Sequence, residues 1–171
     1  MYRVSSRSFP NRRAVSTDKA IAIIPKDGFE TDVRRNPYIA YNCLRLVATN
    51  GAQTDPIAEK IEGGMSARDA LTTVLFGMDY EHDDYNTPRI AAVVRRGDST
   101  GYLGIVRHDA LLVRAFELEP GRAYYVCTYE QDVPCEAFRD ESFDAETADA
   151  ACGYVLGRGA FSVLERPITA A

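Results

Sequence analysis

The sequence predicts one α+β domain in which helices cover sheets of mainly antiparallel strands. Three observations support this prediction. Short apolar or alternating runs, typical of strands, occur near both ends of the chain and in a series after Pro88. The helical patterns do not alternate regularly with these runs, as they would in a parallel βαβ fold. The length of 171 residues, with 46% hydrophobic and 26% charged residues, suits a single domain over residues 1–171.

The first half of the chain contains three predicted strands and two predicted helices. The strands cover residues 2–9, residues 20–25 (AIAIIP) and residues 38–47. The helices cover residues 55–62 and 67–78. The second helix begins after Ser66, which forms with Asp69 the Ser-x-x-Asp pattern of an N-cap and its reciprocal partner. One face of this helix is apolar and carries Leu71, Val74, Leu75 and Met78.

The second half begins with four strand-like runs separated by polar or Gly-containing turns. They cover residues 89–94, 102–106, 111–116 and 123–129. Their close spacing predicts an antiparallel meander. A third helix is predicted at residues 145–156 and a last short strand at residues 161–165.

Charge and hydropathy exclude several classes of protein. The net charge is -5, from 20 basic and 25 acidic residues, and basic residues are in excess only within residues 1–50. A general nucleic-acid surface is therefore not expected, although an anion site near the N-terminus is compatible with this distribution. No apolar run approaches the roughly 20 residues that cross a bilayer. The N-terminal arginines are not followed by the apolar segment of a signal peptide. We expect a cytoplasmic protein without a membrane partner.

The cysteines and phosphate-binding motifs narrow the chemistry further. Four cysteines lie too far apart for a zinc site or a dense disulfide scaffold, so we expect them to be reduced and mostly buried: Cys43, Cys127, Cys135 and Cys152. The chain contains neither a Gly-x-Gly-x-x-Gly sequence nor a Walker loop. A dinucleotide site and a P-loop are therefore not expected.

All the asparagines lie in or beside short polar stretches near strand ends or turns. The stretches are SSRSFPNR (residues 5–12), RNPYIAYNC (35–43), TNGAQTD (49–55), MDYEHDDYNTPR (78–89) and TYEQ (128–131). Their neutral hydrogen-bonding groups, arginines, tyrosines and few carboxylates suit a polar heterocycle with a phosphate. The same residues also favour turns whatever their function, so composition alone leaves both interpretations open.

These stretches, in this order, resemble the archaeal inosine monophosphate (IMP) cyclohydrolase family. The resemblance rests on YRVSSRSFPNR at residues 2–12, RNPYIAYNC at 35–43, MDYE at 78–81, NTPRIAA at 86–92 and CTYEQ at 127–131. The intervening NGAQTDPIAEK and GMSARDA segments agree less closely. The resemblance extends over nearly all of residues 2–131 and is weaker beyond them.

The resemblance implies a fold and an activity. The fold is a four-layer αββα sandwich of mainly antiparallel sheets, similar to the N-terminal nucleophile (Ntn) hydrolases. This chain begins with Met1, Tyr2 and Arg3, so it has no N-terminal Thr, Ser or Cys nucleophile. The implied reaction closes 5-formamidoimidazole-4-carboxamide ribonucleotide (FAICAR) to IMP with loss of water, in purine biosynthesis. Family members continue at both ends, so we expect a shortened molecule with an unpaired sheet edge.

Three residues are the candidate catalytic groups. Glu81 lies among tyrosines at the end of a predicted helix, where its proton affinity is expected to rise toward neutrality; the alternative is a solvated acid in an acidic run. Tyr41 is the candidate donor to the formyl oxygen or the leaving hydroxyl, unless it is a packing residue. Arg12 binds the phosphate or faces the developing oxyanion. Loss of the first role raises KM, and loss of the second lowers kcat.

The other candidates bind the substrate. Arg7 and Arg89 are further phosphate candidates, and the carboxamide, ribose and formyl groups are matched to four asparagines, Asn36, Asn42, Asn50 and Asn86. Asn11 in the first stretch completes the polar set, and Tyr38 is a candidate cover for the imidazole. No metal spacing joins His82 and His108, so no metal or other cofactor is expected.

Two further functions remain open at this point. One is a catalytically inactive protein of the same fold that binds purine nucleotides, and the other is an interaction domain without a ligand. Conversion of FAICAR, as opposed to binding alone, separates the first from the enzyme. The resemblance also implies a homo-oligomer, with a tetramer as its expected form, and FAICAR and IMP as the partners.

Overall fold

The computed structural model describes residues 3–5, 12–16, 20–26, 41–44, 46–165 and 167–170. The first half of this part contains β1 (Arg3–Ser5), β2 (Arg12–Ser16), β3 (Ala20–Pro25), β4 (Tyr41–Leu44), β5 (Val47–Thr49), α1 (Thr54–Glu62) and α2 (Ala67–Met78). The second half contains β6 (Arg89–Val94), β7 (Thr100–Arg107), β8 (Ala110–Glu117), β9 (Gly121–Tyr124), β10 (Arg139–Phe143), α3 (Ala148–Val155), the 3₁₀ helix η2 (Gly159–Val163) and β11 (Pro167–Ala170). The predicted α+β class is confirmed.

The largest sheet of the described part is a fully antiparallel meander. Its seven strands follow the order β2-β3-β4-β5-β6-β7-β8. Every neighbouring pair is antiparallel. The predicted strand at residues 89–94 is β6, and the two runs that follow it are β7 and β8. The run at residues 38–47 corresponds to β4 and β5, which pair with each other.

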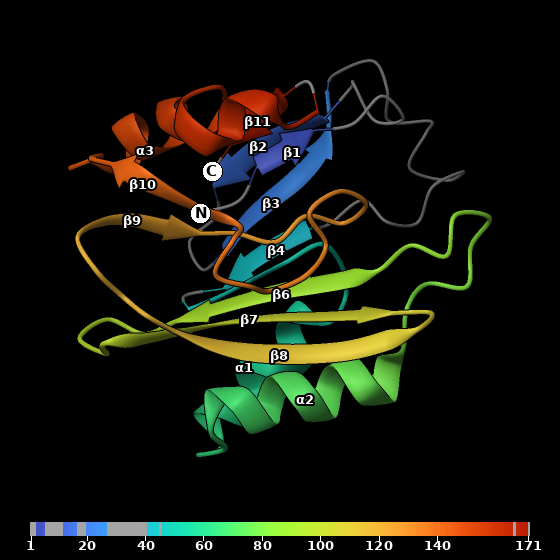
Figure 1. Cartoon of the computed structure of the whole chain (residues 1–171). Coiled ribbons are helices and arrows are strands. Elements are labelled where there is room, and N and C mark those ends of the chain that lie inside the picture. Colours follow the sequence, from blue (N-terminus) through green and yellow to red (C-terminus); the bar gives the residue numbers. More distant parts are fainter. Residues whose placement is uncertain are drawn as a thin grey trace.

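Helices α1 and α2 cover one face of this sheet (Figure 1). The apolar positions of α2 recur at helical spacing, so they face the sheet together. The largest buried cluster combines Leu71 and Val74 of α2 with Ile57 of α1 and Val93 of β6. The predicted N-cap is confirmed: the Ser66 hydroxyl accepts a hydrogen bond from the Asp69 amide at 3.1 Å. The Asp69 carboxylate accepts from Arg68, its neighbour in sequence.

A second layer lies on the opposite face of the main sheet (Figure 1). It contains two antiparallel pairs, β9 with β10 and β1 with β11. Helix α3, predicted from sequence, packs over this layer and buries Tyr154 and Val155 with Phe161 of η2. No helix in the described ranges has the length and apolar character that a membrane span requires.

Several features of the structure differ from the sequence predictions. Residues 161–165 were expected to be a strand, but η2 occupies this region and the last strand is β11. The run at 123–129 ends as a strand at Tyr124, and its partner β10 was not predicted because RDESF is polar. Strand β2 was also not predicted. Of the cysteines whose side chains the structure describes, none forms a disulfide, as expected, but they are partly exposed and not buried: Cys127, Cys135 and Cys152.

A buried carboxylate joins β10 to the helices above it. Asp140 is 3% exposed. It accepts hydrogen bonds from the Tyr154 hydroxyl at 3.0 Å, the Ala160 amide at 2.7 Å and the Ser142 amide at 2.8 Å. A buried carboxylate needs such donors because its desolvation is otherwise uncompensated. The Asp140 contacts therefore fix α3 and η2 to the second layer.

Tyr154→Phe is expected to lower the free energy of unfolding by about 1–3 kcal/mol, because it removes one donor from the buried Asp140. Tyr124→Phe is the matched control, since its hydroxyl donates to the exposed Glu136 at 3.0 Å. The control is expected to change stability by less than about 0.5 kcal/mol. Urea unfolding of both variants measures the difference, and equal losses would contradict the importance of the Asp140 contacts.

Candidate active site

The antiparallel meander brings two candidate catalytic residues to one end of the main sheet. Neighbouring strands pair Arg12 with Pro25, Ile23 with Tyr41, Leu44 with Val47, Thr49 with Ala91 and Arg89 with Val106. Neighbouring strands run in opposite directions. The first residues of β2, β4 and β6 therefore lie at the same end of the sheet as the last residue of β5. The backbones of Arg12 and Tyr41 therefore lie at the same end of the sheet as Asn50 and Arg89.

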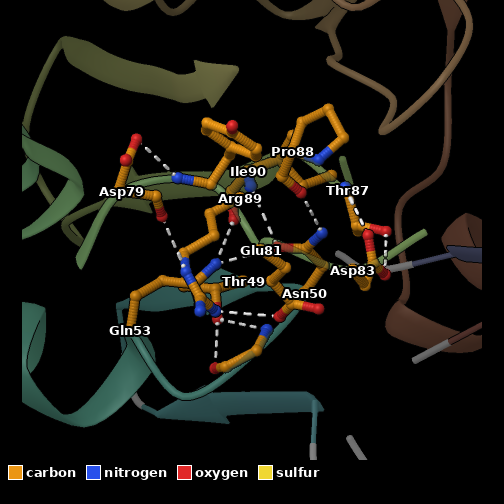
Figure 2. Close-up of polar contacts among 12 residues, drawn as sticks. Thr49, Asn50, Gln53, Asp79, Glu81, Asp83, Thr87, Pro88, Arg89 and Ile90 are labelled. Atoms are coloured by element: carbon orange, nitrogen blue, oxygen red, sulfur yellow. Dashed lines mark hydrogen bonds and ion pairs between the residues drawn. The ribbon is translucent and has the colours of Figure 1, made fainter. Parts of the chain in front are cut away.

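The segment that joins α2 to β6 carries Glu81 to this end of the sheet (Figure 2). The Glu81 amide donates to the Thr87 carbonyl at 2.8 Å, which closes the segment into a loop. Asn50 then fixes the loop to the sheet. Its Nδ2 donates to the Pro88 carbonyl at 2.8 Å, and its Oδ1 accepts from the Ile90 amide at 2.9 Å. The Asn50 side chain thus positions the loop that holds Glu81.

Glu81 forms a buried ion pair with Arg89. Glu81 is 7% exposed, and Arg89 Nη1 lies 2.9 Å from its Oε1. Arg89 Nε donates to the Asp79 carbonyl at 2.8 Å, and Nη1 is also within 3.4 Å of Gln53 Oε1. Figure 2 shows the Arg89 guanidinium between Glu81 and Gln53. The guanidinium is therefore held from the end of α2 and from the start of α1.

The pKa of Glu81 is raised above its ordinary value. Burial is the main cause, because a charged carboxylate loses its hydration there. The positive charge of Arg89 opposes this shift without cancelling it, and the negative charge of Asp83 adds to it. Among the described residues, Arg89 is the hydrogen-bond partner of Oε1, and Oε2 has none. Glu81 can therefore gain or lose a proton at Oε2 while Oε1 stays on Arg89.

A second segment, residues 127–131, joins the Glu81 loop through Tyr129. Thr87 Oγ1 donates to Asp83 Oδ2 at 2.6 Å, so it accepts from the Tyr129 hydroxyl at 2.7 Å. Burial tends to raise the pKa of Asp83, but hydrogen bonds from Thr87 and from the Tyr85 amide hold it below its ordinary value. The pKa of Tyr129 is raised, mainly by partial desolvation of its hydroxyl although the residue is 61% exposed; the hydrogen bond with Thr87 opposes this shift, and the charges of Asp83 and Glu81 add to it. Tyr129 thus stays protonated near Glu81.

A polar pocket of about 270 Å³ opens between these two segments. It is lined by Tyr85, Asn86, Pro88, Arg107, His108, Asp109, Thr128, Tyr129 and Asp132. Arg107 ends β7 and makes ion pairs with Asp109 at 2.9 Å and Asp132 at 2.8 Å. Two carboxylates thus exceed the charge of the one guanidinium. The pocket suits a neutral polar group better than a phosphate.

The structure brings together three of the five polar stretches, residues 49–55, 78–89 and 128–131. Asn86 lines the pocket, while Asn50 and Arg89 are engaged in contacts within the protein. Arg12, Tyr41 and Asn42 are placed by their backbones alone. Four candidates lie outside the described residues and stay predictions: Arg7, Asn11, Asn36 and Tyr38.

Sequence reasoning did not select Gln53, Thr87, Arg107 or Tyr129. Gln53 is fully buried, and its Nε2 donates to Asn50 Oδ1 at 2.8 Å and to the Ile90 carbonyl at 3.1 Å. A glutamine immediately before a helix, inside the TNGAQTD stretch, was the available signal. Within the described ranges, no group of three or more His, Cys, Asp and Glu side chains is arranged to hold a metal ion.

Comparison with known proteins identifies the family. A family model described as IMP cyclohydrolase-like protein matches residues 1–171. The IMP cyclohydrolase of Methanosphaera stadtmanae is 45% identical over 174 residues, which cover 98% of this chain and 82% of the relative. The IMP cyclohydrolase of Methanococcus maripaludis is 46% identical over an alignment of 178 residues, which covers 99% of this chain and 84% of the relative. The IMP cyclohydrolase of Halobacterium salinarum is 53% identical over an alignment of 157 residues, which covers 88% of this chain and 75% of the relative. The chain therefore belongs to the IMP cyclohydrolase-like family.

Proposed function

We propose that this chain closes FAICAR to IMP with release of water. The observation that carries the proposal is Glu81, a buried carboxyl of raised pKa with one oxygen held by Arg89 and the other without a partner among the described residues. The charge of Glu81 acts on Tyr129, which lines the pocket and is joined to the Glu81 loop through Thr87. Family membership supports the same reaction, because the relatives are named IMP cyclohydrolases.

The reaction is intramolecular, so its demands are alignment and proton transfer. The carboxamide nitrogen attacks the formyl carbon and loses a proton, while the formyl oxygen becomes a hydroxyl. This hydroxyl then leaves as water after gaining a proton. The former formamide nitrogen loses its own proton as the C=N bond forms, so one oxygen and two hydrogens leave in total.

Glu81 suits the proton transfers. When ionised, Oε2 accepts the proton of the carboxamide nitrogen, and the carboxylic acid so formed returns it to the leaving hydroxyl. A pKa raised by burial brings the two forms closer in population near neutral pH. Tyr41 is proposed to give a proton to the formyl oxygen as it becomes a hydroxyl, and its phenolate then takes up the proton that the former formamide nitrogen releases. Arg12 is proposed to face the developing oxyanion or the phosphate.

The charges at this end of the sheet favour separate binding places for the phosphate and for the ring of the substrate. Arg89 and Arg107 already have carboxylate partners at this end of the sheet. We therefore assign the phosphate to Arg7 and Arg12, the candidates that the family resemblance supplies. The heterocycle is assigned to the pocket beside Tyr129 and Asn86. Asn11, Asn36, Tyr38 and Asn42 remain proposed substrate-binding residues.

The proposal includes the finer fold and the assembly. A single domain with the four-layer αββα arrangement of Ntn hydrolases is supported by helices on the outer face of each strand layer (Figure 1). The family resemblance further supports a cytoplasmic homo-oligomer. FAICAR and IMP are the proposed substrate and product.

The purified chain is expected to convert FAICAR to IMP in the presence of a chelator, at a rate far above closure in buffer alone. Product formation is followed by chromatography of the nucleotides. Binding of IMP without conversion would indicate an inactive nucleotide-binding protein. Complete loss of turnover in chelator, restored by added metal, would contradict a metal-free mechanism.

A further inference from the structure

The Arg89 guanidinium is fixed by several contacts within the protein. Its side chain is 13% exposed. Nε is bound to the Asp79 carbonyl at the end of α2, and Nη1 contacts Glu81 and Gln53. These contacts come from the end of one helix and the start of another, so they fix both the position and the plane of the guanidinium.

The partners of Arg89 are themselves fixed. Gln53 is fully buried and donates to Asn50 and to the Ile90 carbonyl, so its Oε1 cannot leave Arg89 without breaking those bonds. Asn50 in turn holds the backbone on both sides of Arg89, through Pro88 and Ile90. The network connects β5, α1 and β6 and ends at the Glu81 carboxylate.

A phosphate bound to Arg89 would lie beside the Glu81 carboxylate. The carboxylate is already within 2.9 Å of Nη1 and is almost as buried as the core residues. Adding a phosphate would bring a second anion to that carboxylate, and like charges at short range disfavour each other. The contacts therefore favour a role for Arg89 toward Glu81 over a role toward the substrate phosphate.

We propose, building on the proposed function, that Arg89 is a positioning residue that holds the Glu81 carboxylate for proton transfer and does not bind the substrate phosphate. It fixes Oε1 and leaves Oε2 for the substrate. It also keeps the charged form of Glu81 accessible despite burial. The other charged or titratable groups that act on Glu81 within the described residues are Asp83 of the same loop and Tyr129 of the 127–131 segment.

The test is kinetic and compares Arg89→Met with Arg89→Lys. Arg89→Met is expected to lower kcat about 10-fold, with KM and the Kd for IMP within about threefold of the unmodified chain. Removing the positive charge of Arg89 raises the pKa of Glu81 further. The part of the kcat–pH profile that depends on the protonation of Glu81 is therefore expected to move to higher pH by about one unit or more. Arg89→Lys keeps the charge and is expected to restore the position of that part of the profile with an intermediate kcat.

A second measurement does not depend on turnover. The carboxyl carbon of Glu81, observed by ¹³C NMR during a pH titration, is expected to titrate at higher pH in Arg89→Met than in the unmodified chain. Arg122→Met is the matched control, because Arg122 of β9 makes ion pairs with Glu119, which precedes that strand, and with Glu141 of β10, outside the site. The control is expected to leave both the NMR titration and the pH profile unchanged.

Several outcomes would overturn the inference. A rise in KM and in the Kd for IMP of more than about 10-fold, with kcat and the pH profile unchanged, would make Arg89 a phosphate ligand. An equal shift in Arg122→Met would show a general effect of charge. Absence of turnover in the unmodified chain would overturn the proposed function and the catalytic part of this inference with it. An unmoved Glu81 titration in an active enzyme would overturn this inference alone.

Discussion

Glu81→Gln is expected to lower kcat for FAICAR closure by about 10²- to 10⁴-fold, with little change in KM. Glutamine has nearly the same size as glutamate, and its carbonyl oxygen can still accept the hydrogen bond from Arg89. It cannot take up and return a proton at Oε2. The variant thus preserves the shape of the site and removes the proposed proton transfer. Initial rates at saturating FAICAR, corrected for uncatalysed closure, provide the measurement.

The control for this variant comes from the same acidic run. Asp84→Asn removes a negative charge three residues away, at an exposed position. It is expected to change kcat by less than about twofold. If Glu81→Gln kept the activity of the unmodified chain, or if Asp84→Asn lost as much, Glu81 would not be the proton-transfer residue.

The stability of Glu81→Gln, measured at different pH values, tests the raised pKa of Glu81. A carboxyl whose pKa is higher in the folded state than in the unfolded state favours folding in its protonated form. Its contribution is fully present below the unfolded-state pKa and is lost as the pH rises through the folded-state pKa. The free energy of unfolding of the unmodified chain, relative to Glu81→Gln, is therefore expected to fall with rising pH across that interval.

The fold elements with the strongest periodicity could be predicted from sequence. The apolar stripe of α2 and the apolar runs of β6 to β8 specify elements with buried side chains, so pattern and structure agree there. The strand β10 could not be found in this way. It is polar, and its position depends on pairing with β9 and on the buried contacts of Asp140. The last strand, β11, likewise depends on its pairing with β1 at the other end of the chain.

The candidate site was predictable as a set of stretches but not as a set of contacts. The sequence indicated which polar stretches matter, and the meander then brought three of them together through pairing between β5, β6 and β7. The roles within the set depend on these long-range contacts. Asn50, expected to read the substrate, holds the backbone beside Arg89. Gln53 could not be selected from sequence, because nothing in residues 49–55 indicates that its side chain contacts Arg89.

The backbone at Gly51 lies directly beside the side chains of Gln53, Arg89 and Glu81. A Cβ at this position would lie 2.8 Å from Gln53 Oε1, 3.2 Å from Arg89 Nη1 and 3.4 Å from Glu81 Oε1. The backbone cannot readily withdraw, because the Gly51 carbonyl accepts hydrogen bonds from Thr49 and Thr54 at 2.9 and 3.0 Å. A methyl group at this position must therefore displace the Gln53 side chain and crowd the Arg89 guanidinium, and the Glu81 carboxylate moves with Arg89 because the two form an ion pair.

Gly51→Ala is expected to lower kcat about 10²-fold, because a displacement of the order of 1 Å is enough to disrupt proton transfer. Overpacking is also expected to lower the free energy of unfolding by about 1–3 kcal/mol. Gly77→Ala in α2 is the matched control, since a Cβ there would meet no atom within 4 Å. It is expected to keep full activity and to be as stable as the unmodified chain or more so. Steady-state kinetics and urea unfolding measure both effects.

The double variant shows whether Gly51 acts through Glu81. If the methyl group impairs catalysis by moving the carboxylate, Gly51→Ala has little left to impair once Glu81 is glutamine. The kcat of the double variant is then expected to match that of Glu81→Gln alone within about threefold, far from the product of the two single effects. Multiplication of the two effects would instead mean that Gly51 supports substrate alignment by a route independent of Glu81, and the close approach to Gln53 and Arg89 would then concern stability only.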